Sequence, residues 1–283
     1  MNRIGIVGAG SMGAGIAHAS ALSGFDVILN DVSADLMKKG LDGISSELRK
    51  GVAKGKLPPS APAEVLSRIT LVPTLDGFAG CSLIIEAVVE NIEIKKQLFK
   101  TLESVCTPTA ILATNTSSLS VTSIASVLTT PERMLGIHFF NPAHIMKLVE
   151  IVQGHRTSDD TMASAIEFSR LLGKTPVVAK DTPGFIVNRI ARPYYGEALR
   201  LLGEGAASIE EIDRIARLEG GFRMGPFELM DLIGIDVNFA VTQSMYEQTF
   251  GEPRYRPHII QQNMVDAGLL GRKTLRGFYE YSK

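Results

Sequence analysis

The sequence predicts a doubly wound α/β domain followed by an all-α domain. Short β-rich segments alternate with helical segments over about the first 180 residues, an order typical of a parallel sheet with helices on both faces. A cluster of chain-breaking residues, KDTPG at Lys180–Gly184, then interrupts the chain. Every strong pattern after this cluster is helical. We therefore predict one domain over residues 1–183 and a second, helical domain over residues 184–283.

Short apolar runs predict the strands of the first domain, and longer amphipathic runs predict its helices. The expected strands are Arg3–Val7, Asp26–Asn30, Ile69–Val72, Ser82–Glu86, Ala110–Thr114, Met134–Phe140, Leu148–Val152 and Thr175–Ala179. The expected helices are Met12–Ser23, Ala34–Lys54 and Ile92–Val105, with one more between the last two strands. In the second domain, the expected helices are Phe185–Leu202, Ser208–Leu218, Phe227–Thr249 and Pro257–Ala267.

The composition is that of an ordinary globular protein and excludes several classes. Of 283 residues, 45% are hydrophobic and 21% are charged, and the net charge is −1, so nucleic acid and membrane surfaces are not expected partners. Two cysteines without a CxxC motif or a Cys/His cluster argue against a disulfide scaffold and a metal site. The N-terminal residues contain no secretory or transit signal. We expect a cytoplasmic protein.

The segment GAGSMG at residues 8–13 predicts a dinucleotide-binding site of the Rossmann type. It follows a predicted strand and opens a predicted helix, whose N-terminus attracts a pyrophosphate. Asp31 ends the second strand, where its carboxylate accepts hydrogen bonds from ribose hydroxyls and repels a 2′-phosphate, which favours NAD over NADP. The alternative is a glycine turn with a solvated aspartate. The predicted site comprises Gly8, Gly10, Ser11, Met12, Gly13 and Asp31.

Polar residues follow two further strands of the predicted sheet. Glu90 and Asn91 come after SLIIEAV, and Asn115, Ser117 and Ser118 come after AILAT. Ligands of open α/β sheets bind outside the carboxyl ends of the strands, so these residues are expected near the nicotinamide end of the cofactor. Each of them could equally be a turn former or a helix cap.

A histidine and a glutamate interrupt two apolar strands. His138 lies in LGIHFF and Glu150 lies in KLVEIV. A carboxylate inside a buried run is costly unless it is paired, and an imidazole in a neighbouring strand is a natural partner. Such a pair would serve proton transfer beside a hydride transfer. A structural histidine and an unrelated glutamate remain the alternative.

Asn188, in PGFIVNRI just past the domain boundary, raises a similar question. Its amide could cap backbone groups, or it could project into a cleft between the domains and bind a substrate carbonyl. The sequence leaves both interpretations open.

Over essentially its full length, the chain resembles the stand-alone form of the 3-hydroxyacyl-CoA dehydrogenase family. The segments that carry the resemblance are IGIVGAGSMGAGIA, IIEAVVENIEIKKQLF, ATNTSSLSV, GIHFFNPAHIMKLVEIV, KDTPGFIVNRI and MGPFELMDLIGID. The resemblance implies NAD-dependent, reversible oxidation of an (S)-3-hydroxyacyl-CoA, such as 3-hydroxybutyryl-CoA, to the 3-ketoacyl-CoA.

The resemblance also implies a role for each matched residue. His138 matches the catalytic histidine, Glu150 the glutamate that orients it, Ser117 the serine near nicotinamide and substrate, and Asn188 the asparagine near substrate. The residues that match the cofactor site are Glu90, Lys95, Asn115, Ser117, Asn141 and Lys273. The chain departs from the family pattern at Leu275, where glycine is usual, and at His144, where a small or proline-like residue is expected.

A coenzyme A thioester is the substrate that the resemblance implies. A basic cluster at the end of the second long helix could meet its phosphates, and it comprises Arg49, Lys50, Lys54 and Lys56. Lys56 best matches a CoA-contacting position, although a solvated helix face is the simpler interpretation. The family also pairs through its helical domain, and the apolar segment Phe227–Ile235 is expected to need a partner, so we expect a homodimer.

Three other functions compete with this interpretation. A related dehydrogenase of a free hydroxy acid, of the carnitine or gulonate type, could keep the same fold and the same His/Glu pair. A 3-hydroxyisobutyrate-type enzyme relies on lysine chemistry, and the intact HFFNP and LVEIV segments argue against it. A non-catalytic NAD-binding protein would be favoured by loss of the four matched catalytic residue types, all of which are present.

Overall fold

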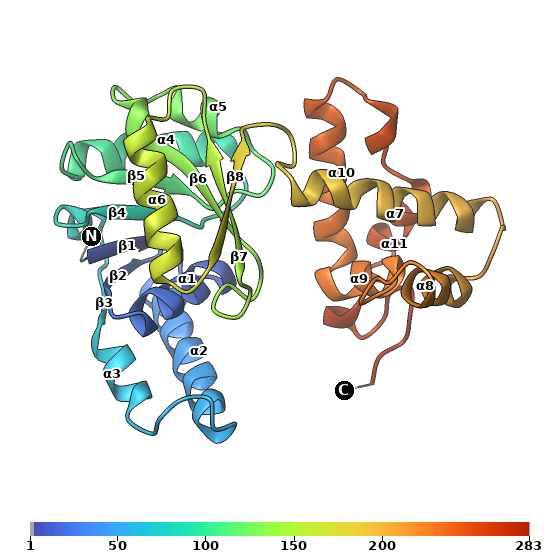
Figure 1. The fold of residues 1–283 in the computed structure, drawn as a ribbon, viewed down its shortest axis with the longest axis horizontal. Coiled ribbons are helices and arrows are strands. Elements are labelled where there is room, and N and C mark those ends of the chain that lie inside the picture. Colours follow the sequence, from blue (N-terminus) through green and yellow to red (C-terminus); the bar gives the residue numbers. More distant parts are fainter. Residues whose placement is uncertain (1–2, 283) are drawn as a thin grey trace. The chain divides into compact units, whose positions relative to one another are not determined.

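The computed structural model describes residues 3–282. The chain divides into two compact units, Met1–Asp181 and Thr182–Lys283, which are shown in Figure 1. This division lies two residues before the boundary expected from the KDTPG cluster. Among the described residues, no helix has both the length and the apolar character needed to cross a membrane.

The N-terminal unit is built on one sheet of eight strands in the order β3-β2-β1-β4-β5-β6-β7-β8. The strands are β1 Arg3–Val7, β2 Asp26–Asn30, β3 Ile69–Leu71, β4 Leu83–Glu86, β5 Ile111–Thr114, β6 Met134–Phe139, β7 Leu148–Gln153 and β8 Thr175–Lys180. The first six are parallel and follow the Rossmann order. β7 runs antiparallel to β6, and β8 runs parallel to β7. The predicted fold class is therefore confirmed.

Helices cover both faces of this sheet (Figure 1). They are α1 Ser11–Leu22, α2 Ala34–Ala53, α3 Ala61–Ser67, α4 Ile92–Val105, α5 Val121–Ala125 and α6 Asp159–Leu171. Ser33, Asn91 and Ser158 cap α2, α4 and α6 by accepting backbone N–H groups in their first turns. The helices α3 and α5 were not predicted, because seven and five residues are too few to show helical periodicity.

Two apolar cores lie on opposite faces of the sheet. Ile6 of β1 belongs to the core that also contains Leu48 of α2 and Phe168 of α6. Leu112 of β5 belongs to the other core, with Phe99 of α4. Strands that are buried on both faces have continuous apolar sequences, which is why short apolar runs identified them.

The C-terminal unit is helical, as expected. Its helices are α7 Val187–Gly203, α8 Ile209–Leu218, α9 Pro226–Ile233, α10 Ile235–Gln248 and α11 Ile259–Asp266. The single helix predicted over Phe227–Thr249 is wrong, because Gly234 has a φ of +101° and divides it into α9 and α10. The expectation that Phe227–Ile235 needs a partner is also wrong for Phe227 and Ile235, which are buried in the unit's own core.

Two buried aspartates hold the C-terminal segment against these helices. Asp213 of α8 accepts hydrogen bonds from the N–H groups of Phe227 and Glu228 and from the hydroxyl of Tyr279. Asp231 of α9 accepts from the N–H groups of Phe278 and Tyr279 and from the hydroxyl of Tyr281. Burial raises the pKa of Asp213 despite its three donors. Each carboxylate therefore has the donors that a buried acid requires.

His144 stacks on His18 of α1. The ring centroids are 4.6 Å apart, and Nε2 of His144 lies 3.8 Å from Oε2 of Glu47 on α2. His18 is 4% exposed, and its buried Nε2 has no hydrogen-bond partner among the described residues. Burial, together with the neighbouring His144 and Lys174, lowers the pKa of His18 to about 4, although Glu47 opposes this shift. The structure therefore holds His18 neutral at pH values where a solvated histidine is protonated.

This burial predicts an acid-sensitive stability. Between pH 6.5 and 4 the unfolded chain binds a proton at His18 that the folded chain does not bind, so stability falls as pH falls through this window. The shift from 6.5 to about 4 corresponds to about 3 kcal/mol. Over this window, the free energy of unfolding of His18→Gln should fall less than that of the wild type, by that amount. Urea unfolding at each pH measures both values. Equal losses in the two proteins would show that His18 is not the responsible group.

Candidate active site

The glycine-rich loop joins β1 to α1 and leaves the start of that helix open. Gly8 has a φ of +101°, and a side chain there would meet the carbonyl oxygen of Ala87. A Cβ on Gly13 would lie 1.8 Å from the carbonyl oxygen of Gly8, so only glycine allows the helix to begin so close to the strand. Gly10 is the N-cap, and a Cβ there would meet nothing within 4 Å. No side chain of residues 3–282 caps the first turn, and no acidic residue lies in it.

Asp31 is held at the end of β2 by two backbone donors. The N–H of Ala9 donates to Oδ2 at 2.6 Å, and the N–H of Val32 donates to Oδ1 at 2.7 Å. Each carboxylate oxygen has a second lone pair for a ribose hydroxyl. The open helix N-terminus and the anchored carboxylate therefore fit a dinucleotide, with the pyrophosphate at the loop and the adenosine ribose at Asp31.

Glu90 anchors the loop that carries Ser117. Its Oε1 accepts hydrogen bonds from the hydroxyl of Thr116, the N–H of Ser117 and the hydroxyl of Ser118, the last two at 3.2 Å. Burial would raise the pKa of Glu90, but the ammonium of Lys95 and the hydrogen bonds from Thr116 and Ser117 outweigh it and hold that pKa below its usual value. The charged form of Glu90 thus keeps the Asn115–Ser118 loop in one conformation.

Lys95 is buried at 1% exposure and pairs with two carboxylates. Its Nζ lies 2.5 Å from Oε1 of Glu86 and 3.2 Å from Oε2 of Glu90. Glu86, at the end of β4, also accepts from Thr114 at 2.7 Å. A direct contact of Lys95 with the cofactor stays a prediction; in the structure Lys95 links the end of β4 to Glu90.

Glu86 and Thr116 belong to this network and were not among the predicted site residues. Glu86 carries the signal that identified Glu150, a carboxylate within an apolar strand (LIIE). The hydrogen bond of Thr116 to Glu90 joins residues 26 positions apart in the chain. Sequence spacing gives no indication of such a contact.

Asn115 and Asn141 lie at the ends of adjacent segments of the site. Oδ1 of Asn115 accepts the N–H of Phe139 at 2.9 Å, which ties the loop after β5 to the residue following His138. The hydroxyl of Ser11 donates to Oδ1 of Asn141 at 3.5 Å. The structure therefore brings the segment after β6 to the glycine-rich loop, so the predicted cofactor residues Ser11 and Asn141 lie together.

His138 and Glu150 are directly opposite each other in the antiparallel pair β6–β7. Nδ1 of His138 lies 2.7 Å from Oε2 of Glu150, and the two residues are only 5% and 1% exposed. A carboxylate accepts but does not donate, so Nδ1 is the protonated nitrogen of a neutral imidazole held in this geometry. The predicted adjacency of the two strands is confirmed, and the arrangement is that of an oriented general base.

Asn188 and Lys273 lie in the C-terminal unit. Asn188 is the second residue of α7. Lys273 forms an ion pair with Asp236, with Nζ–O distances of 2.5 and 2.6 Å. Leu275 has a φ of +61°, a left-handed conformation that costs a side-chain-bearing residue about 1 kcal/mol. The roles of Asn188 and Lys273 stay predictions.

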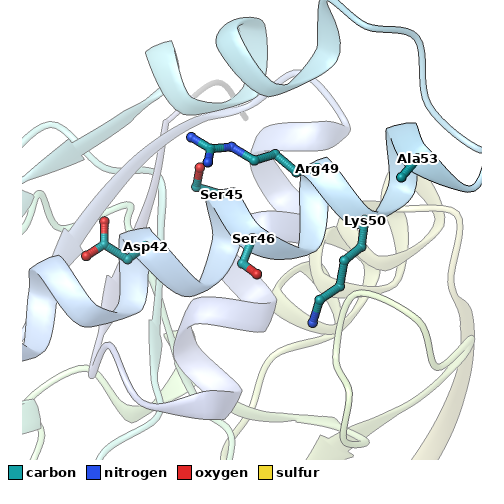
Figure 2. A pocket seen from close by; sticks show the side chains of 6 residues that line it. All are labelled: Asp42, Ser45, Ser46, Arg49, Lys50 and Ala53. Carbon is teal, nitrogen blue, oxygen red and sulfur yellow. The ribbon is translucent and has the colours of Figure 1, made fainter.

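A groove of about 560 Å³ lies on α2, next to part of the predicted basic cluster (Figure 2). Its lining residues all come from that helix and are Asp42, Ser45, Ser46, Arg49, Lys50 and Ala53. Lys50 also pairs with Glu47 at 2.7 Å. Lys54 and Lys56 do not line the groove, and Lys56 is exposed in the turn after α2.

Each of the two units matches one domain of a known protein family. Residues 3–182 match the NAD binding domain of 3-hydroxyacyl-CoA dehydrogenase, and residues 184–281 match the C-terminal domain of that family. The chain belongs to the 3-hydroxyacyl-CoA dehydrogenase family. The glycine-rich loop and Asp31 are therefore parts of an NAD-binding domain.

Individual 3-hydroxyacyl-CoA dehydrogenases resemble the chain over its whole length. The 3-hydroxyadipyl-CoA dehydrogenase of Escherichia coli is 46% identical over 98% of the chain, which spans 58% of that longer protein. The 3-hydroxybutyryl-CoA dehydrogenase of Bradyrhizobium diazoefficiens is 45% identical, with 99% of the chain and 96% of the relative covered. The crystal structure of (S)-3-hydroxybutyryl-CoA dehydrogenase from Ralstonia eutropha has a TM-score of 0.95 at 42% identity, with both chains fully covered.

The buried pair predicts the effect of two substitutions. His138→Gln should lower kcat with a 3-hydroxyacyl-CoA by about 10²–10⁴, because the general base is lost. Glu150→Gln should also slow turnover and displace the pH–rate profile, because an amide does not stabilise a positive imidazolium. Stopped-flow turnover and NADH fluorescence titration measure both effects, and NADH affinity should stay near that of the wild type.

His155→Gln is the matched control, because His155 is an exposed histidine just beyond the end of β7. It should turn over at the wild-type rate. Near-normal turnover in His138→Gln would remove His138 from the proposed role.

Proposed function

We propose that this chain is an NAD-dependent dehydrogenase of (S)-3-hydroxyacyl-CoA, with 3-hydroxybutyryl-CoA as a substrate and 3-ketoacyl-CoA as the product. The observation that carries the proposal is the buried His138–Glu150 pair. The residue after His138 donates to Asn115, and Asn141, three residues after His138, accepts from Ser11 of the dinucleotide loop. An oriented base beside an NAD site is what oxidation of a hydroxyl requires.

His138 acts as the base in the oxidative direction. Its Nε2 takes the proton of the 3-hydroxyl while the hydrogen on C3 leaves as hydride, so that the C3–O bond becomes a carbonyl. NAD⁺, when bound, supplies the acceptor of that hydride. Glu150 accepts the hydrogen bond from Nδ1 and stabilises the imidazolium that forms. In the reverse direction, protonated His138 returns the proton to the carbonyl oxygen.

Ser117 and Asn188 are the proposed positioning contacts for the oxygen atoms of the substrate. The support for Ser117 is its anchored loop, since Glu90 accepts both its N–H and the hydroxyls that flank it. The support for Asn188 is its place in the PGFIVNR segment that the chain shares with the family. Contacts of this kind restrict the reacting groups to one orientation.

A coenzyme A thioester is the proposed form of the substrate. The groove on α2 supports it, because the lining residues Arg49 and Lys50 supply cations for phosphates (Figure 2). Lys56 is proposed as a further phosphate contact from the exposed turn after α2. The 3-hydroxybutyryl-CoA dehydrogenase of Bradyrhizobium diazoefficiens, at 45% identity, supports a short acyl chain.

The reverse reaction tests substrate and cofactor together. NADH oxidation with acetoacetyl-CoA should be fast, whereas free acetoacetate should give at most a trace of activity. NADPH should be a poor cofactor, because the carboxylate of Asp31 repels a 2′-phosphate. Asp31→Ser should reduce the ratio of the activity with NADH to the activity with NADPH, without changing the preference for the CoA thioester over the free acid.

Each outcome of this assay has a separate meaning. Turnover of free acetoacetate alone would replace the CoA thioester by a free hydroxy acid as the substrate class. NADH binding without turnover of either substrate would refute the proposed activity and indicate a non-catalytic NAD-binding protein.

We also propose that the chain is a homodimer that pairs through its C-terminal unit. Exposed apolar side chains of this unit support the proposal, among them Ile215 and Leu218 of α8, at 59% and 72% exposure. Light scattering should give twice the mass of one chain. Leu218→Glu should weaken the pairing, and Val32→Glu, at an exposed position of the other unit, should not. A monomer at all concentrations would contradict the proposal.

The proposed location is the cytoplasm. Both cysteines, Cys81 and Cys106, are free and buried, and burial raises the pKa of each thiol. Unpaired cysteines of this kind are compatible with a reducing compartment.

A further inference from the structure

The C-terminal unit contains a buried arginine on α7. Arg192 is 4% exposed, and its guanidinium lies over the ring of Tyr195 at 4.9 Å. Nη1 donates to the carbonyl oxygen of Asn238 at 2.8 Å and to the hydroxyl of Thr242 at 3.0 Å, both on α10. All of these partners are neutral. The positive charge of Arg192 is therefore buried among aromatic and polar groups.

Within residues 3–282, no carboxylate forms an ion pair with Arg192. Two buried acids of the same unit, Asp213 and Asp231, are already satisfied by three donors each. Burial lowers the pKa of Arg192 to about 10, so the guanidinium is still charged at neutral pH. A buried charge without a counter-charge is costly, and one that persists calls for a partner.

Two donors at this position lack acceptors. Nε of Arg192 and Nδ2 of Asn238 are both buried without a hydrogen-bond partner among the described residues. Asn238 is 1% exposed, and its Oδ1 accepts from Nε2 of Gln261 at 2.8 Å, which fixes the direction of its amide. The cluster therefore combines one positive charge with two unused N–H donors, a set that matches a carboxylate.

The cluster lies one helical turn from a proposed substrate contact. Asn188 and Arg192 are four residues apart on α7, so their side chains leave the same face of the helix with Cβ atoms about 5–6 Å apart. An acyl chain whose hydroxyl-bearing C3 lies at Asn188 can cover that distance with three carbon–carbon bonds of about 1.5 Å each and a terminal carboxylate.

We propose that Arg192, together with Asn238, binds a carboxylate at the far end of the acyl chain, so that the preferred substrates are CoA monothioesters of 3-hydroxy dicarboxylic acids. This inference rests on the proposed function, because it takes Asn188 as a substrate contact. Arg192 and Asn238 are then specificity-determining residues that act by binding and take no part in the proton or hydride transfer.

Two substrates of equal chain length test the proposal. The six-carbon 3-hydroxyadipyl-CoA ends in a carboxylate, and 3-hydroxyhexanoyl-CoA ends in a methyl group. The wild type should have a kcat/KM roughly 30-fold or more higher for the first, since a desolvated charge pair contributes on that order. The difference should lie mainly in KM, because the contact is made equally in the ground state and the transition state.

Arg192→Met should remove the preference by weakening only the reaction of 3-hydroxyadipyl-CoA. Arg200→Met is the matched control, since it removes a partly exposed arginine of the same helix that already pairs with Glu197. That control should keep the preference of the wild type.

Asn238→Asp is the second variant, in case Arg192→Met does not fold. It places a carboxylate of the protein itself on the residue whose backbone carbonyl already accepts from the guanidinium, so it should fold stably and oxidise 3-hydroxyhexanoyl-CoA normally. It should lose most of its activity on 3-hydroxyadipyl-CoA through a higher KM.

The outcomes separate this inference from the proposed function. Equal kcat/KM values of the wild type for both substrates would overturn the inference and leave the dehydrogenase intact. An unchanged preference in Asn238→Asp would also overturn it. Turnover of neither substrate would instead refute the proposed function.

Discussion

The antiparallel pairing of β7 with β6 is the constraint on which the site depends. Backbone hydrogen bonds of the sheet place His138 directly opposite Glu150, and the residues around the pair are apolar and buried. In that environment each member compensates for the burial of the other, so neither side chain is tolerable alone. The direction of the imidazole, and hence which of its nitrogens faces Glu150, follows from the strand register and not from any flexible loop.

A second buried network supports the loops around this pair. Lys95 joins the end of β4 to Glu90, and Glu90 holds the loop after β5 through three donors. Asn115 then ties that loop to the residue after His138. The charged groups of Lys95 and Glu90, near the carboxyl ends of the strands, thus hold the polar residues of the loop after β5 in place. Hydrogen bonds and ion pairs from such supporting residues hold the side chains of a functional site within about 0.5 Å of one geometry.

Much of this organisation could be predicted from the sequence, because the chemistry appears as polar residues in apolar runs. His138 and Glu150 were identified in that way, and the central strands were identified because they are buried on both faces of the sheet. The reversal of β7 was not predicted, although the segment from Phe140 to Lys147 is too short for the crossover that parallel strands need.

Other features could not be predicted because they exist only in three dimensions. The break at Gly234 is hidden in an apolar run, and tertiary packing decides its backbone conformation. A lysine on an amphipathic helix, such as Lys95, is expected to be exposed. In the structure it is buried because it pairs with Glu86 and Glu90. Arg192 was not singled out for the same reason, since its burial depends on how α10 packs against α7.

In the hairpin of β6 and β7, the length of the connecting segment can vary, but the lengths of the two strands cannot. A side chain changes faces when a strand slips by one residue, so an insertion inside β6 or β7 would remove one member of the pair from the site. An insertion in the connecting segment leaves the register unchanged. That segment already carries His144, which contacts α1 and α2 without disturbing the pair. Changes in this connection can therefore alter the surroundings of the pair while His138 and Glu150 stay opposite each other.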